Sequence, residues 1–159
     1  MIRVLHVVTA MDRGGLETLI MNIYRKIERT KIQFDFLTHS DNKHDFDDEI
    51  LSLGGKIYSV PGRRKGILNN KKALENFFSS HPEYKIVHNH LSSLSYIEPL
   101  KVAKKYNVPI RIIHSHSTQQ SGLKINKYLH FLNRRNIEYY ANYFFAVSEK
   151  AAYWLYGKK

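Results

Sequence analysis

Residues 1–27 have the sequence MIRVLHVVTAMDRGGLETLIMNIYRKI. The apolar run at the start predicts a buried strand, and the segment that carries Gly14 and Gly15 predicts a tight loop. From Leu16 to Ile27 apolar side chains recur with helical spacing, so a helix is expected there. A helix N-terminus has unpaired N–H groups and about half a unit of positive charge. The glycine loop is therefore a candidate phosphate-binding site, because glycine lets a ligand approach the backbone.

Strand-like and helix-like segments alternate along the rest of the chain. The pattern predicts strands at 33–39, 56–60, 85–90, 110–116 and 143–148, and helices near 46–53, 71–80, 96–107, 123–141 and 149–157. Such alternation predicts an α/β fold, a Rossmann-like doubly wound parallel sheet with helices on both faces. The expected organisation is one domain over residues 1–159.

Local signals also predict where some helices begin and end. Gly54 and Gly157 are expected helix stops and Ser148 an N-cap, whereas Pro99 must either lie in the first turn of its helix or kink it. Within the expected helix 123–141, the spacing predicts a buried face formed by Ile125, Tyr128, Leu129 and Leu132.

Composition excludes several classes of protein. Hydrophobic residues make up 43% of the 159 residues, which argues against disorder. The chain has no cysteine, so disulfides and thiolate metal sites are excluded and a cytoplasmic location is expected. No apolar run approaches the roughly 20 residues of a membrane-spanning helix, and no secretory signal is expected.

The net charge of +11 favours a polyanionic partner. Nucleic acid, an anionic membrane surface and phosphorylated ligands are all negatively charged partners that would fit. Arg63 and Arg64 follow the third predicted strand and are candidate anion contacts near a cleft. A basic nucleic-acid-binding protein stays an alternative, although no RNP or KH motif is present.

Four histidines end two consecutive predicted strands, as the pairs His88 and His90, and His114 and His116. Residues i and i+2 of a strand point to one face, so each pair is expected to share a face. The carboxyl ends of parallel strands form the ligand-binding edge of such sheets, where the glycine loop also lies. Zinc ligation is an alternative. No metal is expected, however, because no carboxylate lies beside either pair and nothing in the sequence brings three rings to one point.

Four segments together resemble a known family. IRVLHVVTAMDRGGLE, KIVHNH, VPIRIIHSHS and YFFAVSEKAA are similar, in order and spacing, to the N-terminal half of family-4 glycosyltransferases of the capsular or exopolysaccharide type. The resemblance implies one half of a GT-B enzyme that retains anomeric configuration. It also implies that the C-terminal nucleotide-sugar-binding domain is absent from this chain, which is then expected to be inactive alone.

The resemblance also implies roles for residues. Gly14 and Gly15 would approach the donor diphosphate or its sugar, and His116 would be the catalytic histidine that contacts the donor sugar. The family usually has Thr where this chain has His114, which leaves open whether His114 or His116 faces the cleft.

The remaining candidates, His88, His90, His114, Arg63 and Arg64, would line the acceptor side of the cleft. A nucleotide-sugar would be the donor substrate rather than a cofactor, and the acceptor would be a glycan or a lipid-linked glycan. The expected location is the cytoplasm, at the inner face of the membrane. A stand-alone Rossmann-like module that binds a nucleotide or phosphosugar is the alternative.

Overall fold

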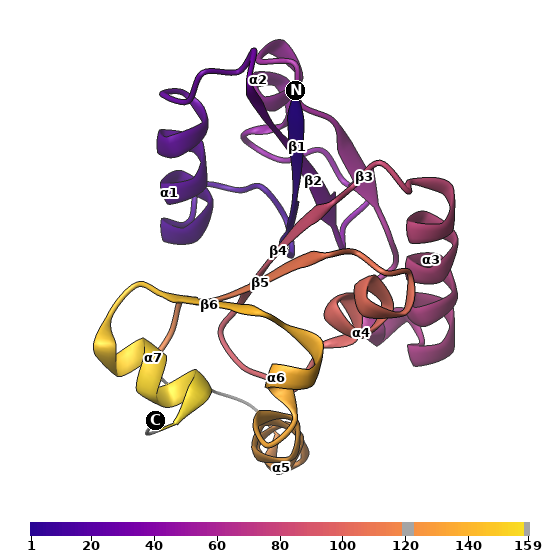
Figure 1. Ribbon diagram of the computed structural model, residues 1–159, viewed down its shortest axis with the longest axis vertical. Helices are drawn as coiled ribbons and strands as arrows, with labels where there is room; N and C mark the ends of the chain where they lie inside the picture. The colour runs from indigo at the N-terminus through magenta and orange to yellow at the C-terminus, as the bar shows by residue number, and fades with distance from the viewer. Residues whose placement is uncertain (119–122, 158–159) are drawn as a thin grey trace.

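The computed structural model describes residues 1–118 and 123–157 (Figure 1). Six strands form one sheet in the order β3-β2-β1-β4-β5-β6, and every neighbouring pair is parallel. The strands are β1 (Ile2–Val7), β2 (Ile32–Thr38), β3 (Ile57–Ser59), β4 (Ile86–Leu91), β5 (Ile110–Ser115) and β6 (Tyr143–Ala146). The strand order reverses between β1 and β4, as in a doubly wound sheet, so the predicted fold class is confirmed.

Helices cover both faces of the sheet. They are α1 (Gly15–Tyr24), α2 (Asp47–Ser52), the short 3-10 helix η1 (Arg63–Lys65), α3 (Ile67–Ser80), α4 (Glu98–Lys105), α5 (Lys124–Arg134), α6 (Ile137–Tyr140) and α7 (Glu149–Tyr156). Helix α1 lies on one side of the strands, whereas α3 and α4 lie on the other (Figure 1). Over the described ranges, no helix combines the length and apolar character that crossing a membrane requires.

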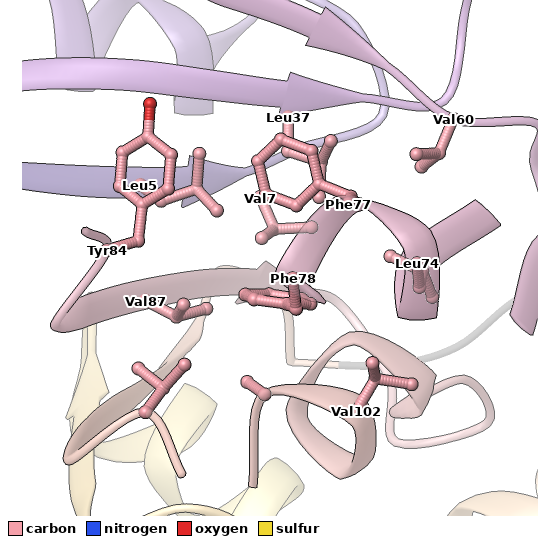
Figure 2. Packing of buried hydrophobic residues seen from close by; sticks show 12 residues of the cluster. Leu5, Val7, Leu37, Val60, Leu74, Phe77, Phe78, Tyr84, Val87 and Val102 are labelled. Atoms are coloured by element: carbon pink, nitrogen blue, oxygen red, sulfur yellow. The ribbon is translucent and has the colours of Figure 1, made fainter. Parts of the chain in front are cut away.

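The largest apolar cluster lies between β1, β2, β4 and the pair α3 and α4 (Figure 2). Leu5 and Val87 from the strands pack against Phe77 and Phe78 of α3 and Val102 of α4. On the opposite face Phe34 and Phe36 of β2 pack against α1 and α2. Both faces of β1 and β2 are therefore fixed by burial, which sets the register of the sheet at its centre.

The four residues predicted to mark helix ends, namely Gly54, Pro99, Ser148 and Gly157, lie at helix ends. Gly54 and Gly157 have φ of +87° and +90°, a left-handed conformation that favours glycine. The Ser148 hydroxyl accepts a hydrogen bond from the Ala151 N–H at 3.2 Å, and Pro99 lies in the first turn of α4. Helix α3 begins at Ile67 rather than 71, directly after Gly66, whose φ is +121°.

The helix predicted over 123–141 is wrong as a single element. The backbone leaves the helical region at Asn136, so two shorter helices, α5 and α6, form instead. The predicted buried face is also wrong, because Ile125, Tyr128 and Leu132 are exposed. The side chain of α5 that is fully buried is His130, which stacks on the Trp154 ring at 4.4 Å. The tertiary contact with α7 therefore decides which face of α5 points inward.

The predicted first helix is also shorter than expected, since α1 ends at Tyr24. Its buried side chains are Ile20, Met21 and Tyr24, whereas Leu19 and Ile23 are exposed. Because Leu16 and Ile27 also pack against the core, the apolar spacing identifies the helix and part of its buried face.

An ion pair between Arg3 and Asp35 joins β1 to β2 beside Tyr84, a residue of the cluster that α3 and α4 cover. Asp35 is fully buried, and the Arg3 guanidinium donates two hydrogen bonds of 2.5 Å to its carboxylate. The Tyr84 hydroxyl and the Lys56 backbone N–H donate to the same carboxylate at 2.7 and 2.8 Å. Burial is the first cause that raises the pKa of Tyr84, and the neighbouring Tyr58 and Asp35 raise it further.

Replacement of Asp35 by alanine is expected to destabilise the fold strongly. Asp35→Ala leaves the charge of Arg3 and the Tyr84 hydroxyl without their partner, at a cost of about 3 kcal/mol in the free energy of unfolding. Urea denaturation measures this. The matched control is Asp48→Ala, which removes an exposed partner of Lys43 and should leave the midpoint unchanged. Equal midpoints for the two variants contradict the role given to Asp35.

Candidate functional site

Four loops meet around one cavity at the carboxyl edge of the sheet. The cavity has a volume of about 980 Å³, and its lining includes Thr9, Ser92, Ser117 and Val147, which follow β1, β4, β5 and β6. Gly15, the first residue of α1, also lines it. The cavity thus lies where the strand order reverses, which is the usual ligand site of this architecture.

The glycine loop leaves room on the cavity side. A Cβ atom placed on Gly15 would meet nothing within 4 Å, so the space beside this backbone is open. Gly14 is the N-cap of α1, and a Cβ placed on it would collide with the Glu17 carboxylate. Glu17 also lines the cavity. The site therefore offers backbone N–H groups for an anion together with a carboxylate that can accept hydrogen bonds from hydroxyl groups.

Five histidines form a continuous layer on the face of the sheet against which α1 packs. We call this set, which comprises His6, His88, His90, His114 and His116, the imidazole layer. His6 Nδ1 lies 2.9 Å from His90 Nε2, and His90 Nδ1 lies 2.9 Å from His116 Nε2. A separate contact of 3.1 Å joins His88 Nε2 to His114 Nδ1. The layer thus contains a hydrogen-bonded chain of three rings and a hydrogen-bonded pair.

Strand register brings these rings together. His6 of β1 is paired with His88 of β4, and His90 of β4 is paired with His114 of β5. The centroids of His88 and His90 lie 4.1 Å apart and their rings stack, and the centroids of His114 and His116 are also 4.1 Å apart, with tilted rings. The hydrogen bonds run diagonally between neighbouring strands, so the layer links β1, β4 and β5 through side chains as well as through the backbone.

Burial keeps the layer uncharged. It lowers the pKa of His6 to about 3 and that of His88 to about 2, and it holds the pKa of His90 well below its usual value. Burial, assisted by repulsion from His114, lowers the pKa of His116 to about 4. Burial also lowers the pKa of His114. Each ring at neutral pH therefore has one N–H donor and one lone pair.

The rings converge more closely than the sequence indicates. In two groups of three histidines, the nitrogens that could ligate a metal lie within 4.8 Å of one another. The groups are His6 with His88 and His90, and His90 with His114 and His116. Tetrahedral zinc bonds of about 2.0–2.1 Å place two nitrogens about 3.3 Å apart. The nitrogens of His90 and His116 instead face each other at hydrogen-bond distance. As placed, the rings hydrogen-bond to one another, and the two groups are also the candidate metal ligands among the described residues.

The structure separates the predicted histidines into two sets. His90 and His116 line the cavity, together with Gly15. His88 and His114 are not part of that lining, and they contact each other and the edge of the Phe145 ring instead. Their positions place His116, rather than His114, beside the space that a ligand would occupy.

The two predicted arginines also differ in position. Arg64 lines the cavity. Arg63 instead donates to the Ser95 carbonyl at 2.8 Å and to Asn126 Oδ1 at 2.7 Å, and its guanidinium lies over the Tyr96 ring. Arg63 thus connects the η1 segment to α5.

His6 was missed by sequence reasoning. It is the one polar side chain on its face of β1, where its neighbours two residues away are Val4 and Val8. That alternation already places His6 on a buried face. What the sequence lacks is the order of the strands, which brings β1 beside β4 and His6 beside the His88 pair.

The imidazole layer makes the stability of the fold depend on pH. Below pH 6.5 the unfolded chain binds protons that the folded chain excludes, so the free energy of unfolding falls as pH falls. Between pH 7.5 and 5.5 we expect a loss of about 1.4 kcal/mol for each of the deeply buried rings of His6, His88 and His90. Urea titrations at the two pH values measure it. The double variant His88→Phe/His114→Phe should reduce the dependence by the share of those two rings and leave that of His6 and His90, and a wild-type stability that is constant over this range contradicts the expectation.

Comparison with solved structures supports the fold. The crystal structure of Acinetobacter baumannii MurG superposes with a TM-score of 0.59 over 95% of this chain and 42% of that chain, at 11% sequence identity. At this identity the likeness shows the architecture alone, which is that of one Rossmann-like half of a GT-B protein.

Two curated proteins are similar in sequence. A putative glycosyltransferase of Bacillus subtilis, EpsF, is 37% identical over 98% of this chain and 41% of its own length. The capsular polysaccharide biosynthesis glycosyltransferase CapH of Staphylococcus aureus is 27% identical over 80% of this chain and 34% of its own. The chain thus spans about two fifths or less of the length of these relatives.

The family profile of Glycosyltransferase Family 4 matches residues 13–157, which include the start of α1, the ends of β4 and β5 and the whole of α7. The match covers the cavity loops from Gly15 to Val147. The chain therefore belongs to glycosyltransferase family 4.

Proposed function

We propose that this chain is the acceptor-side domain of a retaining glycosyltransferase. The whole protein would transfer a sugar from a nucleotide-sugar to a glycan or lipid-linked acceptor in polysaccharide biosynthesis. The observation that carries the proposal is the shared cavity of Gly15, His90 and His116, which come from three separate segments of a family-4 chain. The names of the curated relatives support the class of product.

The donor would be held mostly outside these residues. The cavity is open, and Arg64 and the N-terminus of α1 are its sources of positive charge among the described lining residues. Because the chain spans about two fifths of the relative EpsF, we assign the nucleotide to a domain beyond the 159 residues. The isolated chain should then bind a nucleotide-sugar weakly. Tight binding of nucleotide by this chain alone would favour a stand-alone binding module instead.

His116 would act through a neutral ring. Since its pKa is lowered to about 4, it offers a hydrogen bond rather than a full positive charge at neutral pH. A fixed donor beside a developing negative charge stabilises the transition state. The proposal needs no metal and no cofactor, because the nucleotide-sugar is a substrate and its leaving phosphate can be met by N–H groups at α1 and by Arg64.

The role of His116 is tested in the whole protein by His116→Ala. Loss of one preorganised donor is expected to lower kcat by about 10²–10³-fold. The matched control is His81→Ala, which removes a histidine at the opposite end of β4, where it contacts Glu83 at 3.0 Å. Near-normal turnover of the His116 variant, measured as sugar transfer, excludes this role.

We also propose that the protein works in the cytoplasm, attached to the inner membrane surface through α5. Exposed apolar side chains gather on and beside this helix, namely Leu123, Ile125, Tyr128, Phe131 and Leu132. Lys124 and Lys127, both exposed, lie among them. An exposed helix that combines apolar and basic side chains suits an anionic bilayer surface. The net charge of +11 points to the same partner.

Vesicle sedimentation tests this attachment. The double variant Lys124→Gln/Lys127→Gln should weaken binding to anionic vesicles by about 30-fold, from about 1 kcal/mol per lysine. The control Lys71→Gln/Lys72→Gln removes the same charge from the exposed surface of α3 and should bind as the wild type does. Equal binding of the wild-type chain to neutral and anionic vesicles rules out an electrostatic attachment.

A further inference from the structure

We propose that His6 and His90 are positioning residues that hold the His116 ring in its Nδ1–H tautomer, so that it presents a hydrogen-bond donor to the cavity. The inference deepens the proposed function and rests on the role of His116 in that site. It starts from the chain of three rings, His6, His90 and His116, whose nitrogens lie 2.9 Å apart at both contacts.

The first step is a count of protons. A neutral imidazole has one N–H and one lone pair, so it can donate from one nitrogen and accept at the other. His90 uses both nitrogens, Nε2 toward His6 and Nδ1 toward His116. It must therefore donate to one neighbour and accept from the other. The three rings consequently share one tautomer, either all Nδ1–H or all Nε2–H.

The second step decides between the two arrangements. Nε2 of His6 is buried and has no hydrogen-bond partner among the described residues. If all three rings were Nε2–H, this atom would be a buried donor without an acceptor. If all are Nδ1–H, it is a bare lone pair. Buried backbone N–H groups without a partner are rarer in proteins than carbonyl acceptors without one. The same preference, applied to the imidazole ring, favours the Nδ1–H arrangement.

The surroundings of His6 support this choice. Its ring lies 4.2 Å from that of Phe34 and 5.6 Å from that of Phe36, centroid to centroid, and both side chains belong to the apolar cluster under α1. Burial keeps the three rings neutral, as the lowered pKa values of His6, His90 and His116 indicate. A doubly protonated ring, which would have two donors and no acceptor and so would interrupt the chain of hydrogen bonds, is therefore disfavoured.

The consequence appears at the other end of the chain. When Nε2 of His116 accepts from His90, its proton must reside on Nδ1. This nitrogen makes no hydrogen bond within the described part of the chain, and His116 lines the cavity. Phosphate oxygens are acceptors, and so are the ring and hydroxyl oxygens of a sugar. A fixed Nδ1–H is thus the form that a sugar-phosphate would require.

The wild-type chain gives the direct test. Long-range ¹H–¹⁵N correlation spectra of the ¹⁵N-histidine-labelled chain at pH 7 report the tautomer of each ring. We expect His6, His90 and His116 each to favour Nδ1–H by about tenfold or more. Unlike tautomers within the trio, or a shared Nε2–H form, overturn the proposal. Zinc present at one equivalent in the purified chain also overturns it, because the rings would then hold a metal instead of one another.

Two matched variants separate positioning from general packing. His90→Phe removes the middle of the chain, whereas His88→Phe removes a ring from the same strand and face but only from the separate pair with His114. We expect His116 to lose its single tautomer in the His90 variant and to keep it in the His88 variant. An unchanged His116 tautomer in folded His90→Phe protein contradicts the proposal.

The tautomer measurement still decides the proposal if a variant does not fold or if the proposed function fails. Circular dichroism shows whether each variant folds, and if His90→Phe does not fold, the wild-type spectrum alone decides the question. Neither measurement needs a substrate, so a failure of sugar transfer would overturn the proposed function without changing the tautomer result. In the whole protein, a loss of kcat in His90→Phe is the expected kinetic counterpart, and KM can change as well because His90 itself lines the cavity.

Discussion

The pairing of β1 with β4 is the contact on which the candidate site depends. These strands are far apart in sequence, yet Val4 to Val7 pair in parallel with Ile86 to Asn89. Because parallel strands end at the same edge, this pairing brings the glycine loop after β1 beside the loops that follow β4 and β5. It also places His6 within reach of His90 and extends the imidazole layer to a third strand.

The imidazole layer occupies space that apolar side chains could fill. Buried polar groups cost free energy unless they are hydrogen-bonded, and valine or isoleucine at these strand positions would avoid that cost. Here most of the ring nitrogens satisfy one another, and the remaining cost falls on the buried His6 Nε2. Polar rings thus occupy core positions that apolar side chains normally fill, and they do so next to the ligand-binding edge. Functional constraints most often override stability at such sites.

The parts of the fold that local chemistry controls could be predicted from the sequence. Glycines with positive φ end α2 and α7, and Ser148 caps α7, because these preferences act within a few residues. The break between α5 and α6 could not be predicted, since its helical spacing continues through Asn136 and the contact of His130 with Trp154 comes from elsewhere in the chain.

The candidate site divides in the same way. Gly15, His90 and His116 could be placed at one edge from strand endings alone, because the carboxyl ends of parallel strands always meet. The separation of His116 from His114, and of Arg64 from Arg63, depends on side-chain contacts that no spacing rule contains. His6 requires the strand order itself. The sequence thus locates the edge, and tertiary packing selects the residues that face the cavity.

The charge of the cavity follows from the neutrality of the imidazole layer. Among the described lining residues, Arg64 carries a positive charge and Glu17 a negative one, while His90 and His116 are neutral because burial lowers the pKa of both. A nucleotide-sugar diphosphate carries about two negative charges, which Arg64 and the N-terminus of α1 together offset only in part. The lining therefore suits hydroxyl groups and one phosphate better than a whole diphosphate. This balance of charge supports the acceptor-side role that we propose for the chain, on grounds independent of the length of the relatives.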